Sequence, residues 1–255
     1  MNFVRCAVTA ALGVAGMVWG NTPAISAEVK VMAGSALAGV IKDLGPGFEQ
    51  ATSNTLAAQY GLSRTFQKQI DAGEWFDLAI LSVDTMDNLT KQSKLARGPL
   101  VAITRAGVGV VVRKGAPKPD INSVDAFRTT LLGAKSISYA PRTESGEHIE
   151  RVFERLGVAD QIKAKLKPQQ AVDRVAHVVA EGEAELGMTV TSLLQVPGVE
   201  LVGKIPEDLQ LYLIFTAGIG RDAKQPDAAR ALIKHLTAPT AAPVITARGW
   251  EPAPQ

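Results

Sequence analysis

Short apolar runs alternate along this chain with segments in which apolar residues recur at helical spacing. This alternation is typical of an α/β fold, because buried strands read as continuous apolar stretches and amphipathic helices repeat every three to four residues. Helices are predicted after Ser35, Ser63 and Ser145 and over residues 171–180 and 227–236. The apolar runs predict strands at residues 29–33, 55–60, 76–81, 100–112, 136–139, 186–190, 200–203 and 211–219.

Two of the predicted strands are unusually long. Residues 100–112 form an apolar run of about thirteen residues, whereas most strands have five or six, and residues 211–219 have the same character. A strand of this length can leave one sheet and enter another. We therefore predict two α/β lobes joined by two crossover strands, with the ligand between the lobes. The predicted boundaries are 28–104 with 213–255 for the first lobe and 105–212 for the second.

The chain begins with the pattern of a secretory signal peptide. Arg5 precedes an apolar stretch at residues 7–19, and small residues follow at 24–27. The apolar stretch is shorter than the roughly 20 residues that a membrane-spanning helix needs. We expect cleavage after Ala27, which makes residues 1–27 the signal peptide, with cleavage after Ala24 as the alternative.

Charge and composition argue against several kinds of ligand. The chain has 27 basic and 25 acidic residues, and only Arg5 of these lies in the signal peptide. The mature chain therefore has a net charge of +1, which argues against a surface that binds nucleic acid. Aromatic residues make up 5% of the chain, too few to stack bases or sugar rings. The one cysteine, Cys6, also lies in the signal peptide, which leaves no disulfide and no thiolate metal site. A small polar or ionic ligand is the favoured class.

Three serines, Ser35, Ser63 and Ser145, stand at the starts of predicted helices. A helix start exposes unpaired N–H groups and the positive end of the helix dipole, so several starts aimed at one site would bind an anion. Serine is also a common N-cap residue, and for any one of the three alone that explanation is the simpler one. Only convergence of the three favours anion binding.

Six segments share a characteristic order and spacing: residues 31–35, 63–73, 76–82, 182–187, 236–239 and 248–250. In these segments the chain resembles the periplasmic molybdate-binding proteins, the type II substrate-binding proteins of ABC importers. The resemblance covers nearly the whole mature chain. It implies the type II periplasmic-binding-protein fold, a periplasmic monomer, a small anion as ligand and a permease in the inner membrane as partner. It implies no cofactor and no metal-ligating residue, since hydrogen bonds alone hold the oxyanion.

The resemblance also implies which residues bind the anion. The two binding serines correspond to Ser35 and Ser63, and two backbone amides of the second lobe correspond to Ser145 and Val172. Val172 would act only through its amide.

The tyrosine that completes the family's site has no counterpart, because Val190 stands at its position. Thr189 or Thr191 could replace it only in a different strand register, since a shift of one residue reverses the face to which a side chain points. One hydrogen-bond donor is therefore expected to be missing.

Two arginines beside the serines widen the choice of ligand. Arg64 follows Ser63 directly, and Arg142 precedes Ser145 by three residues. A guanidinium group pairs with a carboxylate through two parallel hydrogen bonds, which suits an organic acid better than molybdate. Alternatively, both arginines point to solvent and pair with nearby glutamates. Molybdate or tungstate is the first candidate ligand, and a small organic carboxylate or other anion is the second.

Motifs of enzymes find little support in this chain. A nucleophile elbow needs Gly-x-Ser-x-Gly, and the glycines around Ser35 have the wrong spacing. The histidines, His148, His177 and His235, have no partners at metal-ligand spacing. We therefore expect a transport receptor with no catalytic residue. A periplasmic enzyme or sensor module on the same scaffold is the alternative, and a pairing of His148 with Ser145 would favour it.

Overall fold

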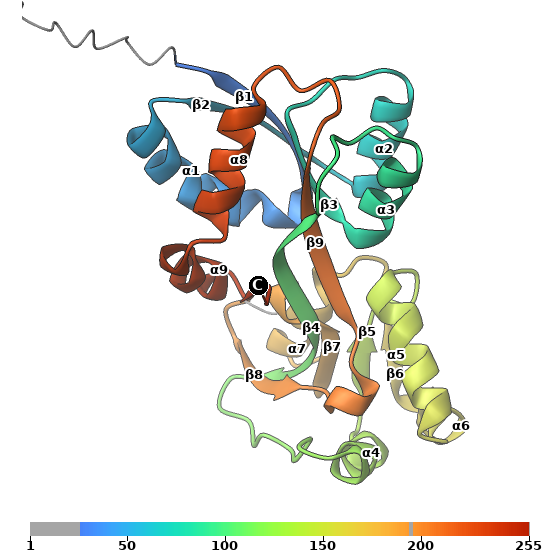
Figure 1. The fold of residues 1–255 in the computed structure, drawn as a ribbon. Helices are drawn as coiled ribbons and strands as arrows, with labels where there is room; N and C mark the ends of the chain where they lie inside the picture. The colour runs from blue at the N-terminus through green and yellow to red at the C-terminus, as the bar shows by residue number, and fades with distance from the viewer. Residues whose placement is uncertain (1–25, 194–195, 255) are drawn as a thin grey trace, which may run out of the picture.

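A computed structural model describes residues 26–193 and 196–254 of the protein. These residues form two lobes joined by long strands (Figure 1). The predicted signal peptide lies outside the described residues, apart from its last two. Within the described ranges, no helix has the length and apolar character needed to cross a membrane.

Lobe 1 is a sheet covered by helices on both faces. Three parallel strands lie in the order β2-β1-β3, and β9 adds to β3 in the antiparallel direction. Alternate residues of β1 enter opposite cores, with Val31 packing toward α1, α8 and α9 and Met32 toward α2 and α3. Burial on both faces explains why these strands read as continuous apolar runs. The elements are β1 (Glu28–Gly34), α1 (Ala38–Thr52), β2 (Thr55–Gly61), α2 (Ser63–Asp71), β3 (Leu78–Ser82), α3 (Val83–Lys91), β9 (Tyr212–Ile219), α8 (Pro226–Leu236) and α9 (Ala242–Ala247).

Lobe 2 repeats this plan with a sheet in the order β4-β7-β5-β6 and with β8 paired to β4. Helices α4, α5 and α6 share one core with the sheet, and α7 packs in a separate core. The predicted helix at 171–180 begins only at Arg174, because residues 170–173 form a bend and a turn. The elements are β4 (Val101–Arg113), α4 (Val124–Gly133), β5 (Ile137–Tyr139), α5 (Glu144–Arg155), α6 (Ala159–Ile162), β6 (Leu166–Pro168), α7 (Arg174–Ala180), β7 (Leu186–Val190) and β8 (Val199–Lys204).

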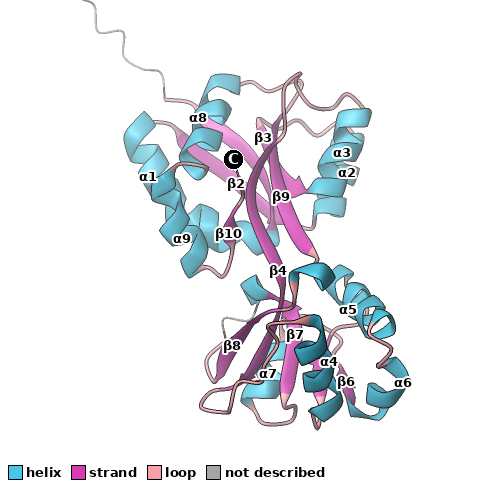
Figure 2. Ribbon diagram, turned by 60° about the horizontal axis from the view of Figure 1, so that its bottom comes forward, coloured by secondary structure: helices cyan, strands magenta, loops and turns pink. Residues whose placement is uncertain are grey.

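The long strand β4 joins the lobes, and Figure 2 shows it running from one to the other. Its residues up to Gly107 pair with β9, whereas those from Val108 onward pair with β7 and β8. At the change of partner, the Gln210 side chain bonds both backbone groups of Val108, at 2.6 and 3.1 Å. The C-terminal strand β10 (Glu251–Pro252) also pairs with β4. The lobe boundaries given above stay a prediction.

Short 3-10 helices complete the chain. They lie at η1 (Ser35–Leu37), η2 (Lys163–Lys165), η3 (Thr191–Leu193), η4 (Glu207–Leu209) and η5 (Pro239–Ala241).

Candidate functional site

Ser35 and Ser63 follow the carboxyl ends of two adjacent parallel strands. The last residue of β1, Gly34, is in register with Gly61 of β2, so the chain leaves both strands at one edge of the sheet. A third serine, Ser82, ends β3 beside them, and its backbone N–H donates to Ser63 Oγ at 3.1 Å. Ligands of open α/β sheets bind at this edge, outside the carboxyl ends of the strands.

None of the three serines singled out in the sequence is an N-cap. The capping residues are instead Gly34, Leu62 and Thr143. Ser35 and Ser63 are the first residues of their helices, and Ser145 is the second residue of α5. The simpler explanation of these serines as caps is therefore wrong.

The loop before α5 holds Ser145 in a tightly packed position. Its side chain is buried, and its Oγ lies 3.3 Å from Thr143 Oγ1. The Thr143 hydroxyl also accepts from the Gly146 N–H at 3.1 Å. A Cβ atom on Gly146 would lie 1.8 Å from the carbonyl oxygen of Ala140, so only glycine fits here.

Val172 lies in the turn between β6 and α7. Because β6 and β5 are parallel neighbours, the loop that carries Val172 and the loop that leads into α5 and Ser145 leave the same edge of the lobe 2 sheet. A bond from the Gln169 N–H to the Tyr139 carbonyl, at 2.8 Å, ties the two strand ends together.

The start of α5 in lobe 2 faces the starts of α2 and α3 in lobe 1. Figures 1 and 2 show these helices on the same side of the molecule. The carboxyl of Glu144, the first residue of α5, responds to charges in the other lobe: partial burial raises its pKa most, Asp84 raises it further, and Arg64 opposes both.

The two arginines singled out in the sequence are exposed, as the alternative of solvent-facing side chains predicts. Arg64 is the second residue of α2, and Arg142 lies in the loop between β5 and α5. Among the described residues neither takes part in an ion pair or a side-chain hydrogen bond. Glu74, a glutamate that follows α2, pairs with Lys30.

The position of the family tyrosine is apolar. Val190 is buried and packs with the core of lobe 1. Of its neighbours, Thr191 already donates its hydroxyl to the Gly249 carbonyl at 3.2 Å. Thr189 is buried with an unpaired hydroxyl, and its side chain points to the opposite face of the strand from Val190.

An aromatic pair beside Ser35 was not apparent from the sequence. A Cβ atom on Gly34 would lie 2.2 Å from the ring of Phe215, so the ring packs directly on the end of β1. Phe215 is also in register with Ser82, and its ring meets Trp250 edge to face at 5.4 Å between centroids. The glycine before Ser35 was the one signal in the sequence for this close approach.

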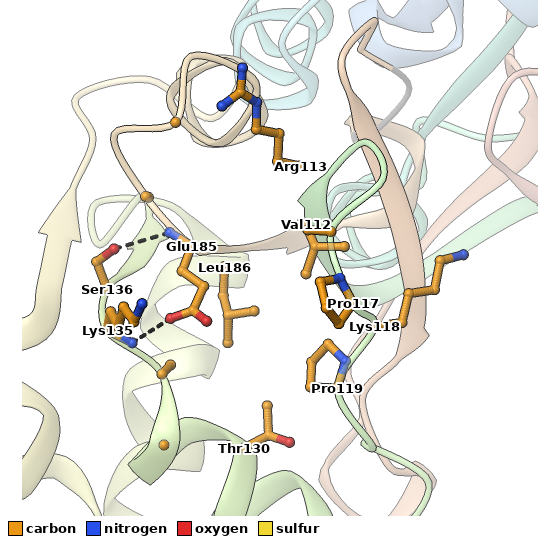
Figure 3. Close-up of a pocket in the computed structure, with 15 residues that line it drawn as sticks. Val112, Arg113, Pro117, Lys118, Pro119, Thr130, Lys135, Ser136, Glu185 and Leu186 are labelled. Atoms are coloured by element: carbon orange, nitrogen blue, oxygen red, sulfur yellow. Dashed lines mark hydrogen bonds between the residues drawn. The ribbon is translucent and has the colours of Figure 1, made fainter.

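A separate hollow of about 600 Å³ lies in lobe 2, and Figure 3 shows Val112, Pro117, Thr130 and Leu186 around it. It lies where β7 begins, at the opposite edge of the sheet from the ends of β5 and β6. None of the predicted site residues lines it.

The histidines do not form a catalytic pair with Ser145. His148 Nε2 bonds the Leu209 carbonyl at 2.7 Å, and His235 Nε2 bonds that of Leu44 at 3.0 Å. His177 is exposed on α7. In the part of the chain that the structure describes, no three His, Cys, Asp or Glu side chains gather as a metal site.

The comparisons with known proteins agree on the family of this chain, but the relatives that they find are named for different activities. Residues 29–251 match the model of a family described as "Bacterial extracellular solute-binding protein". A protein from Pseudomonas sp named "Aconitate isomerase" is 32% identical, over 96% of this chain and 97% of its own. "Molybdate-binding protein ModA" of Azotobacter vinelandii is 28% identical, over 98% and 99%. The solved substrate-binding domain of a putative molybdenum ABC transporter from Clostridium difficile has a TM-score of 0.81 at 19% identity, over 90% of this chain and all of its own.

The Pseudomonas relative corrects the expectation that this chain is not an enzyme. That relative bears the name of an enzyme and aligns over nearly the full length of both chains. The lack of a nucleophile elbow and of paired histidines therefore does not exclude catalysis.

The comparisons confirm the predicted fold and family. The structural neighbour has the two-lobed type II architecture of periplasmic binding proteins, and the family's name places its members outside the cytoplasm. The chain belongs to the bacterial extracellular solute-binding proteins of the ABC-importer type, in the family that includes the periplasmic molybdate-binding proteins.

Proposed function

We propose that this protein binds a small polycarboxylate between its lobes and isomerises an unsaturated tricarboxylate of the aconitate class. The observation that carries the proposal is the pair of unpartnered arginines, Arg64 and Arg142, which flank Ser63 and Ser145. The enzyme relative supports it, since its name gives both the substrate and the reaction.

The arginines beside the two helix starts suit a carboxylate better than a tetrahedral oxyanion. Two arginine side chains can each take a carboxylate through paired hydrogen bonds. The helix starts at Ser63 and Ser145 supply further N–H groups. Val190 stands where the family has a tyrosine hydroxyl, so the donor that the family uses for its oxyanion is missing here.

The location and partner follow from the family. We place the protein in the periplasm, with a permease of the inner membrane as the partner that its closed form would meet. Closure on a ligand would then serve both binding and catalysis, because it removes water from the reacting carbon atoms.

Calorimetric titration and proton NMR on the purified protein test the proposal. We expect cis- or trans-aconitate to bind at least about tenfold more tightly than molybdate, tungstate or citrate, and to be interconverted. Arg64→Gln and Arg142→Gln should each weaken aconitate binding about tenfold or more, since a hydrogen bond to a charged group contributes about 1.5–3 kcal/mol. Arg97→Gln, at an exposed arginine of the loop before β4, is the matched control. Tight molybdate binding without aconitate binding or turnover would refute the proposal.

A molybdate or tungstate receptor is the second candidate function. The adjacent serines Ser35 and Ser63 favour it, as does the Azotobacter vinelandii relative. The same titrations separate the two candidates, because the receptor needs neither arginine and turns nothing over.

A further inference from the structure

The hydroxyl group of Ser63 is held by the backbone of a neighbouring strand. The Ser82 N–H, at the end of β3, donates to Ser63 Oγ at 3.1 Å. Among the described residues, this is the one hydrogen bond that the Ser63 side chain makes. Because the oxygen accepts this bond, the hydroxyl proton points elsewhere and stays free for a ligand.

Ser82 gives this bond a fixed support. It ends a strand that lies between β1 and β9, and it is in register with Phe215 of β9. Its hydroxyl donates to Thr85 Oγ1 at 3.1 Å, and Thr85 is buried in α3 with 3% exposure. Helices α2 and α3 lie side by side (Figure 1), so the hydrogen bond ties the start of α2 to the interior of the sheet.

The Ser63 hydroxyl adds one donor to two backbone donors at the start of α2. The Leu62 carbonyl accepts the N–H groups of Thr65 and Phe66 at 2.9 and 3.1 Å. The N–H groups of Ser63 and Arg64 come before these in the helix and have no backbone partner within the described ranges. A hydroxyl that accepts a hydrogen bond also donates more strongly, since the two bonds polarise one another.

Ser35, the corresponding serine after β1, lacks such a support. Its side chain is exposed and makes no hydrogen bond in the part of the chain that the structure describes. Ser35 can therefore turn before a ligand binds, whereas the Ser63 hydroxyl is already ordered.

Resting on the proposed binding of a small anion beside Ser63, we propose that Ser82 is a positioning residue. Its N–H sets the Ser63 hydroxyl, before binding, in the direction of one oxygen of the ligand. A donor that is already ordered loses less conformational entropy on binding, which raises the affinity. Carboxylate and molybdate oxygens only accept hydrogen bonds, so the arrangement serves either ligand.

The variants Ser82→Pro and Ser82→Ala separate the two groups of Ser82. Ser82→Pro removes the N–H and the hydroxyl, whereas Ser82→Ala removes the hydroxyl alone. The φ angle of Ser82 is −57°, which proline adopts, and Leu81 before it lies in a strand, as proline favours. The proline ring also fills the direction of the lost N–H, so the Ser63 hydroxyl must turn.

Calorimetry on the purified protein measures the effect with trans-aconitate and, separately, with molybdate. We expect Ser82→Pro to weaken binding about three- to tenfold, the range for releasing one ordered side chain, and Ser82→Ala to change it less than about twofold. When Ser63→Ala is already present, Ser82→Pro should change the affinity less than about twofold, because the hydroxyl on which it acts is gone.

A thiol in place of the Ser63 hydroxyl reports the same contact without a ligand. Ser63→Cys introduces it, and the chain's own cysteine, Cys6, lies in the predicted signal peptide. A hydrogen bond from the Ser82 N–H stabilises the thiolate, so adding Ser82→Pro should raise the pKa of this thiol and adding Ser82→Ala should not. The thiol should also have a lower pKa than one introduced by Ser35→Cys, a comparison that needs no proline. Ultraviolet absorbance of the thiolate against pH measures both.

The possible failures can be told apart. A parent protein that binds neither trans-aconitate nor molybdate refutes the proposed function and this role with it. If the parent binds an anion, unchanged affinity in Ser82→Pro refutes only the role of Ser82, and so does an equal loss when Ser63→Ala is present. Equal thiol pKa values in Ser63→Cys and Ser35→Cys, or a pKa that Ser82→Pro leaves unchanged, also overturn the role.

Discussion

Lys204 Nζ lies 2.8 Å from Glu251 Oε1, in an ion pair that connects β8 of lobe 2 to the C-terminal strand of lobe 1. The other carboxylate oxygen of Glu251 accepts from Arg105 Nε at 3.1 Å, on the strand that crosses between the lobes. Lys204 also donates to the Tyr212 hydroxyl at 3.1 Å, and the Arg105 guanidinium stacks over the Tyr212 ring. These contacts tie three strands together beside the point where β4 changes sheets.

Loss of this carboxylate should weaken the joint between the lobes. Glu251→Gln removes the charge from both ion pairs, which are partly exposed, so we expect the free energy of unfolding to fall by about 1 kcal/mol. Urea denaturation measures this. The control is Asp227→Asn, which breaks a pair on the surface of α8 whose aspartate side chain is 94% exposed, and should change stability little. Equal losses in both variants would contradict a special role for the joint.

Gly34→Ala should disturb the packing of Phe215. The new methyl group would lie 2.2 Å from the Phe215 ring, so ring or strand must move, and overpacking of this kind costs about 1–3 kcal/mol. The thermal midpoint should fall, and the additional change Phe215→Leu should restore part of it. Gly133→Ala, in open space at the end of α4, should not destabilise the protein. A Gly34→Ala variant as stable as the parent would show that Phe215 moves freely.

Serines 35 and 63 should matter more for binding than for folding, although Ser63→Ala also removes the acceptor of the Ser82 N–H. Ser35→Ala and Ser63→Ala each remove a donor to a charged ligand, so each should weaken ligand binding about tenfold or more by calorimetry. The control is Ser123→Ala. Ser123 caps α4 and accepts from the Ala126 N–H at 3.1 Å, so its loss should cost about 1 kcal/mol of stability and leave binding intact. Parent-like affinity in the double serine variant would show that the ligand binds elsewhere.

Tyr139 should make stability fall at alkaline pH. Burial, and then the hydrogen bond to Glu150 and its charge, raise the pKa of Tyr139 to about 12. Because the folded state holds this proton more tightly than the unfolded chain, the contribution is complete below about pH 10 and is lost as the pH rises toward 12. Tyr139→Phe should therefore flatten the fall of the unfolding free energy between these pH values, measured by urea denaturation. Identical alkaline slopes would contradict the assignment.

The sequence by itself determined the local elements and the two-lobed plan. Strands such as β1 and β7 are buried on both faces, so their apolar runs are visible without a structure. The length of β4 already indicated a strand shared by two sheets. Short elements were missed: β6 has three residues and β10 has two, too few to show a period. The start of α7 was misplaced because the valine at 172 continues an apolar pattern in which the backbone forms a turn.

Only the tertiary structure decided which polar groups meet. Ser63 and Ser82 are joined by a hydrogen bond because parallel pairing through β1 brings their strand ends to one edge. The pKa of Glu144 is raised by burial and by Asp84 and lowered by Arg64, two residues that lie in the other lobe and far away along the chain. Local periodicity reports which face of an element is buried, but it carries no information about the partner across a sheet or between lobes. That information arises from contacts between distant segments, which is why the sequence indicated candidate anion-binding residues and only the folded chain decided which polar groups lie beside one another.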